Sequence, residues 1–87
     1  MSYAVVLRPA ARRVLRRLDR VTQRRILDAM EGLREDPRPP GVNALQGIPG
    51  LLRLRVGPFR ILYQVEDDRL LVLIVTIGHR REVYRSR

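Results

Sequence analysis

The sequence contains no cysteine and only one histidine, and all 18 of its basic residues are arginine. Without cysteine the chain can form neither a disulfide framework nor a thiolate, and a single histidine excludes a metal site built from several histidines. No apolar run is long enough to span a bilayer, and the N-terminus lacks the charged and hydrophobic regions of a secretory signal. We therefore expect no metal, no cofactor, no membrane association and a cytoplasmic location.

Most catalytic groups are also scarce. The only serines are Ser2 and Ser86, and the acidic residues fall in predicted turns and helix ends, so the sequence shows no carboxylate pair and no nucleophilic triad. A glycine-rich phosphate-binding loop is missing as well. If the protein is an enzyme, it must work with cations and a phenol, a set that suits a reaction at a phosphate.

The charge is strongly positive, with 18 basic against 9 acidic residues and a net charge of +9. Such a chain usually binds nucleic acid or an acidic protein. Codon bias in a GC-rich genome would explain the preference for arginine equally well, although a guanidinium also binds phosphate through two hydrogen bonds. The acids gather at 28–36 and 66–68, whereas 8–25, 53–60 and 80–87 are almost purely cationic. We therefore expect local positive surfaces.

From Leu51 onward, arginine alternates with aliphatic residues, which is typical of a half-buried β-strand. Arg53 and Arg55 would face away from the core, and Gly57-Pro58 would form a two-residue turn into a second strand. Arg55 would then stand opposite Arg60. Two cations about 4 Å apart repel by roughly 4 kcal/mol at an effective dielectric constant of about 20. Because this pairing does not help folding, we interpret the hairpin as an anion-binding site.

The N-terminal part predicts one strand and two helices. Residues 3–8 form a valine-rich strand that stops at Pro9, and residues 10–18 form an amphipathic helix with a basic polar face. That face is either simply solvated or in contact with a nucleic-acid backbone. Asp19 is the expected N-cap of the second helix, which would end where Asp36 precedes proline. Its predicted buried residues are Val21, Ile26, Leu27, Met30 and Leu33.

The proline- and glycine-rich segment 36–50 predicts a loop without regular structure. Residues 70–77 form an aliphatic run typical of a central strand, which we expect Gly78 to end. The predicted fold is α+β, in the order β-α-α-β-β-β. It comprises a mainly antiparallel four-stranded sheet, an N-terminal helical hairpin on one face and a short C-terminal tail or helical turn, all in one domain spanning residues 1–87.

These segments resemble the RelE toxins of toxin-antitoxin pairs, within the wider RelE/ParE superfamily. The resemblance covers nearly the whole chain and is tightest over Leu45-Gln-Gly, Leu52-Arg-Leu-Arg-Val-Gly, Phe59-Arg-Ile-Leu-Tyr-Gln-Val, Gly78-His-Arg and Glu82-Val-Tyr84. It implies a ribosome-dependent endoribonuclease that cleaves messenger RNA in the A site through attack of a 2′-hydroxyl on the phosphate. It also implies a cognate acidic antitoxin as partner.

The resemblance implies a catalytic set of Arg53, Arg55, Arg60, Arg80 and Tyr84. Arg60 would stabilise the phosphate in the transition state, Arg80 would assist the leaving oxygen, and Tyr84 would stack on or orient a nucleotide. The best-known RelE proteins carry lysine at the positions of Arg53 and Arg55. Because arginine has a pKa above about 12, it is a poor general base. We expect these two residues to hold the phosphate and to lower the pKa of the hydroxyl electrostatically.

Other interpretations remain open at this point. His79 titrates in the right range for a base, but strand alternation would direct it away from Arg80. Tyr63 is in phase with predicted core residues. A ParE-like toxin that inhibits gyrase without cutting RNA would share the fold, but that class generally lacks the cationic set with the terminal tyrosine. A non-catalytic basic RNA-binding module would explain the charge but not its placement.

Overall fold

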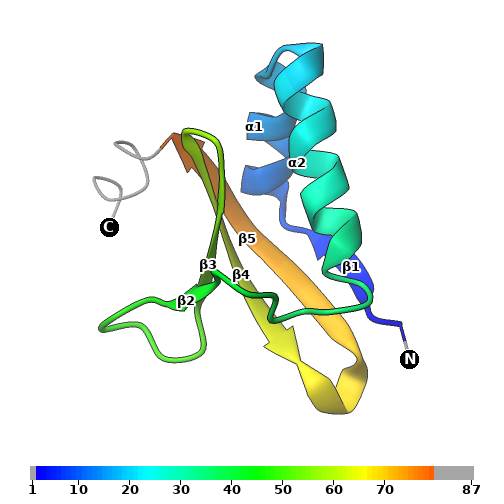
Figure 1. The fold of residues 1–87 in the computed structure, drawn as a ribbon, viewed down its shortest axis with the longest axis vertical. Coiled ribbons are helices and arrows are strands. Elements are labelled where there is room, and N and C mark those ends of the chain that lie inside the picture. The colour runs from blue at the N-terminus through cyan, green and yellow to red at the C-terminus, as the bar shows by residue number, and fades with distance from the viewer. Residues whose placement is uncertain (1, 80–87) are drawn as a thin grey trace.

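The computed structural model describes residues 2–79, so the predicted site residues Arg80 and Tyr84 lie outside the described part of the chain. Two helices lie on one face of a sheet, which confirms the predicted α+β class (Figure 1). In chain order the elements are β1 (Ala4–Leu7), α1 (Pro9–Arg17), α2 (Arg20–Gly32), β2 (Asn43–Ala44), β3 (Leu52–Val56), β4 (Phe59–Glu66), a 3-10 turn (Asp67–Arg69) and β5 (Leu71–His79). No helix in this range is long and apolar enough to cross a membrane.

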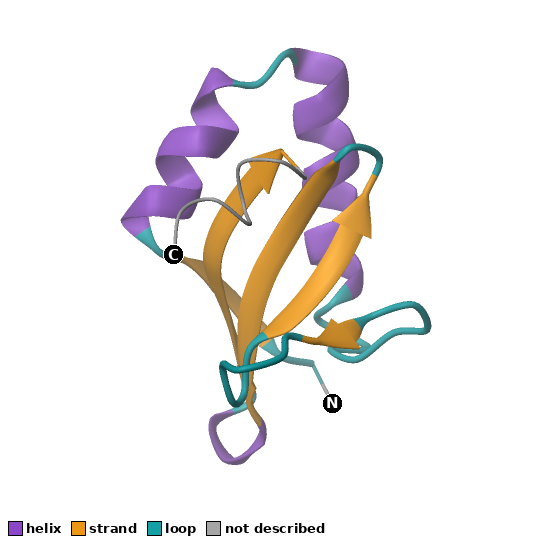
Figure 2. Ribbon diagram, turned by 90° about the vertical axis from the view of Figure 1, so that its left-hand side faces the viewer, coloured by secondary structure: helices purple, strands orange, loops and turns teal. Residues whose placement is uncertain are grey.

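The sheet has five strands in the order β1-β5-β4-β3-β2, with β1 parallel to β5 and the other neighbours antiparallel (Figure 2). The prediction of four strands omitted β2, which lies inside the segment expected to be irregular. Its two residues pair with the start of β3, Asn43 with Arg53 and Ala44 with Leu52. A two-residue strand is too short to show alternation in the sequence, so only its pairing with the sheet edge defines it.

The main core lies between the helices and the sheet. Its buried members come from α1, α2 and the turn after it, β4 and β5: Ala11, Ile26, Met30, Leu33, Ile61, Tyr63, Val72, Ile74 and Ile77. A smaller apolar cluster, built on Leu51 and Leu62 with Leu45 and Val75 packed against them, lies on the other face. We call that second face, opposite the helices, the far face; it is turned toward the viewer in Figure 2.

The caps of the helices follow the sequence closely. Pro9 is the first residue of α1, where its missing N–H is not needed. Asp19 caps α2 as expected, because its carboxylate accepts hydrogen bonds from the Thr22 backbone N–H (3.2 Å) and from the Thr22 hydroxyl (2.7 Å). These hydrogen bonds hold the pKa of Asp19 below its usual value.

Three local predictions were wrong. Val21 and Leu27 are 70% and 41% exposed instead of buried. Ile26 takes the core-facing position, and the next residue in a helix points about 100° away. The helix ends at Gly32 rather than near Asp36, since glycine is a poor helix former. Strand β5 continues through Gly78, where pairing with Arg60 keeps the glycine in the ladder.

Candidate functional site

The predicted arginine hairpin is formed by β3 and β4. Gly57 and Pro58 make the two-residue turn, and Gly57 has a φ of 58°, which the first central position of a type II′ turn requires and which most other residues resist. The resulting register places Arg55 opposite Arg60, as predicted. Sequence alternation and turn length were sufficient to establish this pairing.

All three hairpin arginines lie on the far face of the sheet. In β3, the aliphatic residues that alternate with Arg53 and Arg55 pack against the main core under the helices. In β4, Arg60 lies between two residues that pack in the same core. Because side chains alternate along a strand, Arg53, Arg55 and Arg60 must point to the opposite side. The fold therefore gathers three cations near the turn end of the hairpin.

The three cations differ in exposure. Arg55 is exposed, Arg53 is half-buried, and Arg60 is only 7% exposed. The Nη1 atom of Arg60 donates a long hydrogen bond of 3.4 Å to the carbonyl of Phe59. The Arg55 side chain makes no hydrogen bond or ion pair with any residue in the range 2–79. The site thus combines a cation held within the fold with one that is open to an incoming anion.

A hollow of about 310 Å³ lies beside Arg53 and Arg55, between the edge of β3 and the loop that follows α2. Its lining residues are Pro40, Gly41, Asn43, Arg53, Leu54 and Arg55. Gly41 has a φ of 90°, a conformation that suits glycine. The volume is at the lower end of the range for ligand pockets, roughly 300–1,000 Å³. The hollow extends the arginine site sideways from the far face to the sheet edge.

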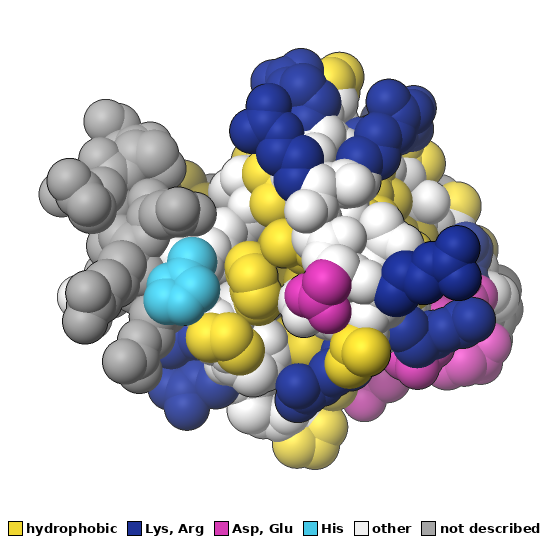
Figure 3. All heavy atoms as spheres, turned by 90° about the horizontal axis from the view of Figure 1, so that it is seen from above, with side chains coloured by type: hydrophobic (Ala, Val, Ile, Leu, Met, Phe, Trp, Pro, Cys, Tyr) yellow, Lys and Arg dark blue, Asp and Glu magenta, His cyan; other side chains and the backbone are white. Residues whose placement is uncertain are grey.

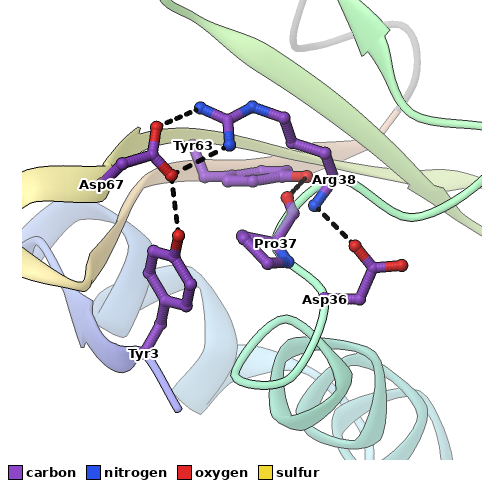
Figure 4. Close-up of polar contacts among 6 residues, drawn as sticks. All are labelled: Tyr3, Asp36, Pro37, Arg38, Tyr63 and Asp67. Carbon is purple, nitrogen blue, oxygen red and sulfur yellow. Dashed lines mark hydrogen bonds and ion pairs between the residues drawn. The ribbon is translucent and has the colours of Figure 1, made fainter. Parts of the chain in front are cut away.

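The loop beside this hollow is tied to the sheet by a polar cluster at the other end of β4 (Figure 4). Arg38 donates two hydrogen bonds to the carboxylate of Asp67, at 3.1 and 2.9 Å, and the Tyr3 hydroxyl donates a third at 2.7 Å. Hydrogen bonds from Arg38 and then from Tyr3 lower the pKa of Asp67 to about 2. The hydrogen bond between the Tyr3 hydroxyl and Asp67 raises the pKa of Tyr3.

A buried tyrosine fixes the start of the same loop. Tyr63 is fully buried, as predicted, and its hydroxyl donates a 2.7 Å hydrogen bond to the carbonyl of Pro37. Burial raises the pKa of Tyr63 to about 12. Sequence reasoning missed the contributions of Arg38 and Asp67, which are 29 residues apart and have no local pattern that links them. Tertiary contacts at Pro37 and Arg38 therefore hold one wall of the hollow.

His79 does not join the arginines. Its ring packs edge-to-face on Phe59, with centroids 5.7 Å apart and ring planes at 78°. The two residues are opposite each other in the ladder, and Phe59 packs against the main core, so His79 lies on the helix side. This position does not favour a role as the base. Within residues 2–79 no cluster of three histidine, cysteine or acidic side chains could hold a metal ion.

Comparison with known proteins is consistent with this geometry. Residues 5–84 match a family model described as the ParE toxin of the type II toxin-antitoxin system parDE. The chain is 30% identical over 86 residues to toxin RelG of Mycobacterium tuberculosis, covering 98% of this chain and 99% of RelG.

Solved structures give the same result. RelE in the archaeal RelE-RelB complex from Pyrococcus horikoshii superposes with a TM-score of 0.81 at 27% identity, covering 92% of this chain and 97% of the other. A mutant of Escherichia coli toxin RelE in the free state superposes with a TM-score of 0.78 at 27% identity, covering 98% and 93%.

Proposed function

This chain belongs to the RelE-type toxins of type II toxin-antitoxin systems, and from that premise we propose that it is a ribosome-dependent endoribonuclease that cleaves messenger RNA in the A site. The observation that supports this activity best is the convergence of Arg53, Arg55 and Arg60 on the far face at one end of the hairpin. Three guanidinium groups in one place match the charge of a phosphodiester that is being cleaved.

In the proposed reaction the RNA supplies its own nucleophile. The 2′-hydroxyl oxygen forms a bond to the adjacent phosphorus, the bond from phosphorus to the 5′-oxygen breaks, and the hydroxyl proton passes to solvent. Arg60, held by burial, stabilises the negative charge that grows on the phosphorane oxygens. Arg53 and Arg55 hold the phosphate and lower the pKa of the hydroxyl, because arginine does not act as a base near neutral pH.

Two further residues complete the proposal from beyond the described part of the chain. Arg80 would assist the departing 5′-oxygen, and Tyr84 would stack on or orient a nucleotide. Arg80 follows β5, the strand that pairs with β4 beside Arg60. Both residues are assigned from the family resemblance, so mutation is the direct way to test them.

We also propose that an acidic antitoxin covers this surface in the resting cell. Relatives of this fold are found in complexes with an antitoxin, including the Pyrococcus horikoshii RelE-RelB complex. The net charge of +9 favours an acidic partner, which would compete with RNA for the same arginines.

The test is to induce the protein in cells and to map messenger RNA 5′ ends by primer extension. Wild type should produce cuts in phase with codons, and Arg60→Ala should reduce cleavage at least about 100-fold. Arg80→Ala and Tyr84→Ala, which removes the aromatic ring, should reduce it as well. Arg69→Ala, which removes an exposed arginine at the other end of β4, is the control and should cut like wild type. Intact transcripts after wild-type induction would refute the nuclease.

A second candidate follows from the family model, which is named for ParE. In that case the protein would inhibit gyrase by direct contact and would leave RNA intact. Growth arrest with unchanged transcripts and altered plasmid supercoiling would select this candidate. The arginine cluster on the far face favours the nuclease, because a protein target does not require several phosphate-binding groups.

A further inference from the structure

A fourth arginine reaches the hairpin from helix α2. The guanidinium of Arg25 lies against the turn of the β3–β4 hairpin, so that a Cβ atom placed on Gly57 would be 3.6 Å from Nη2, 3.7 Å from Nη1 and 3.8 Å from Cζ. The Nη end of the guanidinium is therefore the part of Arg25 that lies nearest to the turn. The helical layer thus delivers a cation to the turn between Arg55 and Arg60.

Folding alone gives little reason for this placement. The Arg25 side chain is exposed, and within the described residues it makes no hydrogen bond or ion pair. The side chain lies next to a turn that is already flanked by two cations, Arg55 and Arg60, and like charges repel. Because the Arg25 side chain is exposed and makes no hydrogen bond within residues 2–79, its N–H groups remain available to a ligand.

We propose that Arg25 is a further RNA-binding residue, which extends the site around the turn and holds a backbone phosphate of the strand next to the one being cleaved. The proposal rests on the proposed function. An RNA strand carries a phosphate at every nucleotide, so a strand bound by the far-face arginines presents another phosphate just beyond them. Figure 3 looks onto this end of the molecule and shows arginine side chains in several separate patches on its surface.

The chain offers a matched control in Arg24. It precedes Arg25 on the same helix and is also exposed. Its side chain likewise makes no hydrogen bond or ion pair within residues 2–79. Its side chain points about 100° away around the helix, and it is not among the nearest atoms to Gly57. Replacing either arginine by alanine removes the same charge, but only Arg25→Ala removes the cation from the turn.

The experiment measures binding to ribosomes programmed with a messenger RNA that carries 2′-O-methyl groups in the A-site codon, because this RNA lacks the proposed nucleophile. We expect Arg25→Ala to weaken binding about tenfold and to lower the slope of log affinity against log salt by about 0.7–0.9. Arg24→Ala should retain the wild-type slope. Arg25→Lys, which keeps the charge, should restore the slope, and thermal melting of each variant reports any loss of folding.

The outcomes separate the two proposals. Equal losses of ribosome binding in Arg25→Ala and Arg24→Ala would overturn the role of Arg25. Binding to poly-L-glutamate, an acidic polypeptide without phosphate, is measured in parallel. If Arg25→Ala weakens only that binding and not the binding to ribosomes, the role of Arg25 is also overturned. If wild type cleaves messenger RNA and Arg25→Ala binds and cleaves equally well, only this inference fails. If wild type neither binds ribosomes nor cleaves RNA, the proposed function fails and the role of Arg25 fails with it.

Discussion

The two ends of strand β4 use arginine in opposite ways. At the Glu66 end, Arg38 and Arg69 pair with the carboxylates of Asp67 and Glu66 at 2.9 and 3.1 Å. At the Phe59 end, Arg55 stands opposite another cation, and the Arg55 side chain makes no ion pair within residues 2–79. Arginine therefore supports the fold where it meets a carboxylate. Arg55, which faces a cation instead, is available to an anionic ligand.

The largest expected effect on stability is at the paired end. Tyr63→Phe removes the hydroxyl that satisfies the Pro37 carbonyl in a buried setting, so the free energy of unfolding should fall by about 1–3 kcal/mol. Tyr3→Phe is the control, because it also removes one hydroxyl but from an exposed hydrogen bond to Asp67. Urea denaturation measures both. A loss in Tyr3→Phe as large as that in Tyr63→Phe would contradict the importance of burial.

At the cationic end, a substitution should raise the free energy of unfolding instead of lowering it. Arg55→Glu replaces a like-charged cross-strand pair with an opposite-charged one, so the free energy of unfolding should rise by about 0.5–1 kcal/mol. RNA cleavage should be lost in the same variant, as expected for a site that trades stability for activity. Arg38→Glu, which would face Asp67, should instead lower the unfolding midpoint. If Arg55→Glu is less stable than wild type, repulsion does not describe the hairpin.

The smallest of these effects on stability should appear at acidic pH. The pKa of Asp67 is about 2 in the folded chain against an ordinary value of 3.8, so its stabilisation is present above about pH 4 and disappears as the pH falls toward 2. Asp67→Asn should lose this part of the pH dependence of the unfolding midpoint. Asp68→Asn is the control, since the Asp68 side chain makes no hydrogen bond or ion pair in the described chain. This substitution should leave the pH dependence of the unfolding midpoint intact.

Sequence reasoning succeeded where a local pattern was strong. The alternation from Leu52 to Val56 and the Gly57-Pro58 turn predicted the hairpin register, and Asp19 predicted the start of α2. It failed where the outcome depended on neighbours. Val21 was expected to be buried but lies exposed, because apolar character does not show which side of a helix meets the sheet. Strand β2 and the hydrogen bonds of Arg38 were not predicted, because both depend on contacts with residues that are distant in sequence.

The sequence by itself determined the β3–β4 hairpin and the opposition of Arg55 and Arg60, because turn chemistry and strand alternation act over a few residues. Only the tertiary structure decided which cations join that hairpin. Arg25 lies about 30 residues earlier and reaches Gly57 because packing of the helices on the sheet brings α2 to the turn. Pairing of β4 with β5 likewise brings His79 onto Phe59, 20 residues earlier in the sequence.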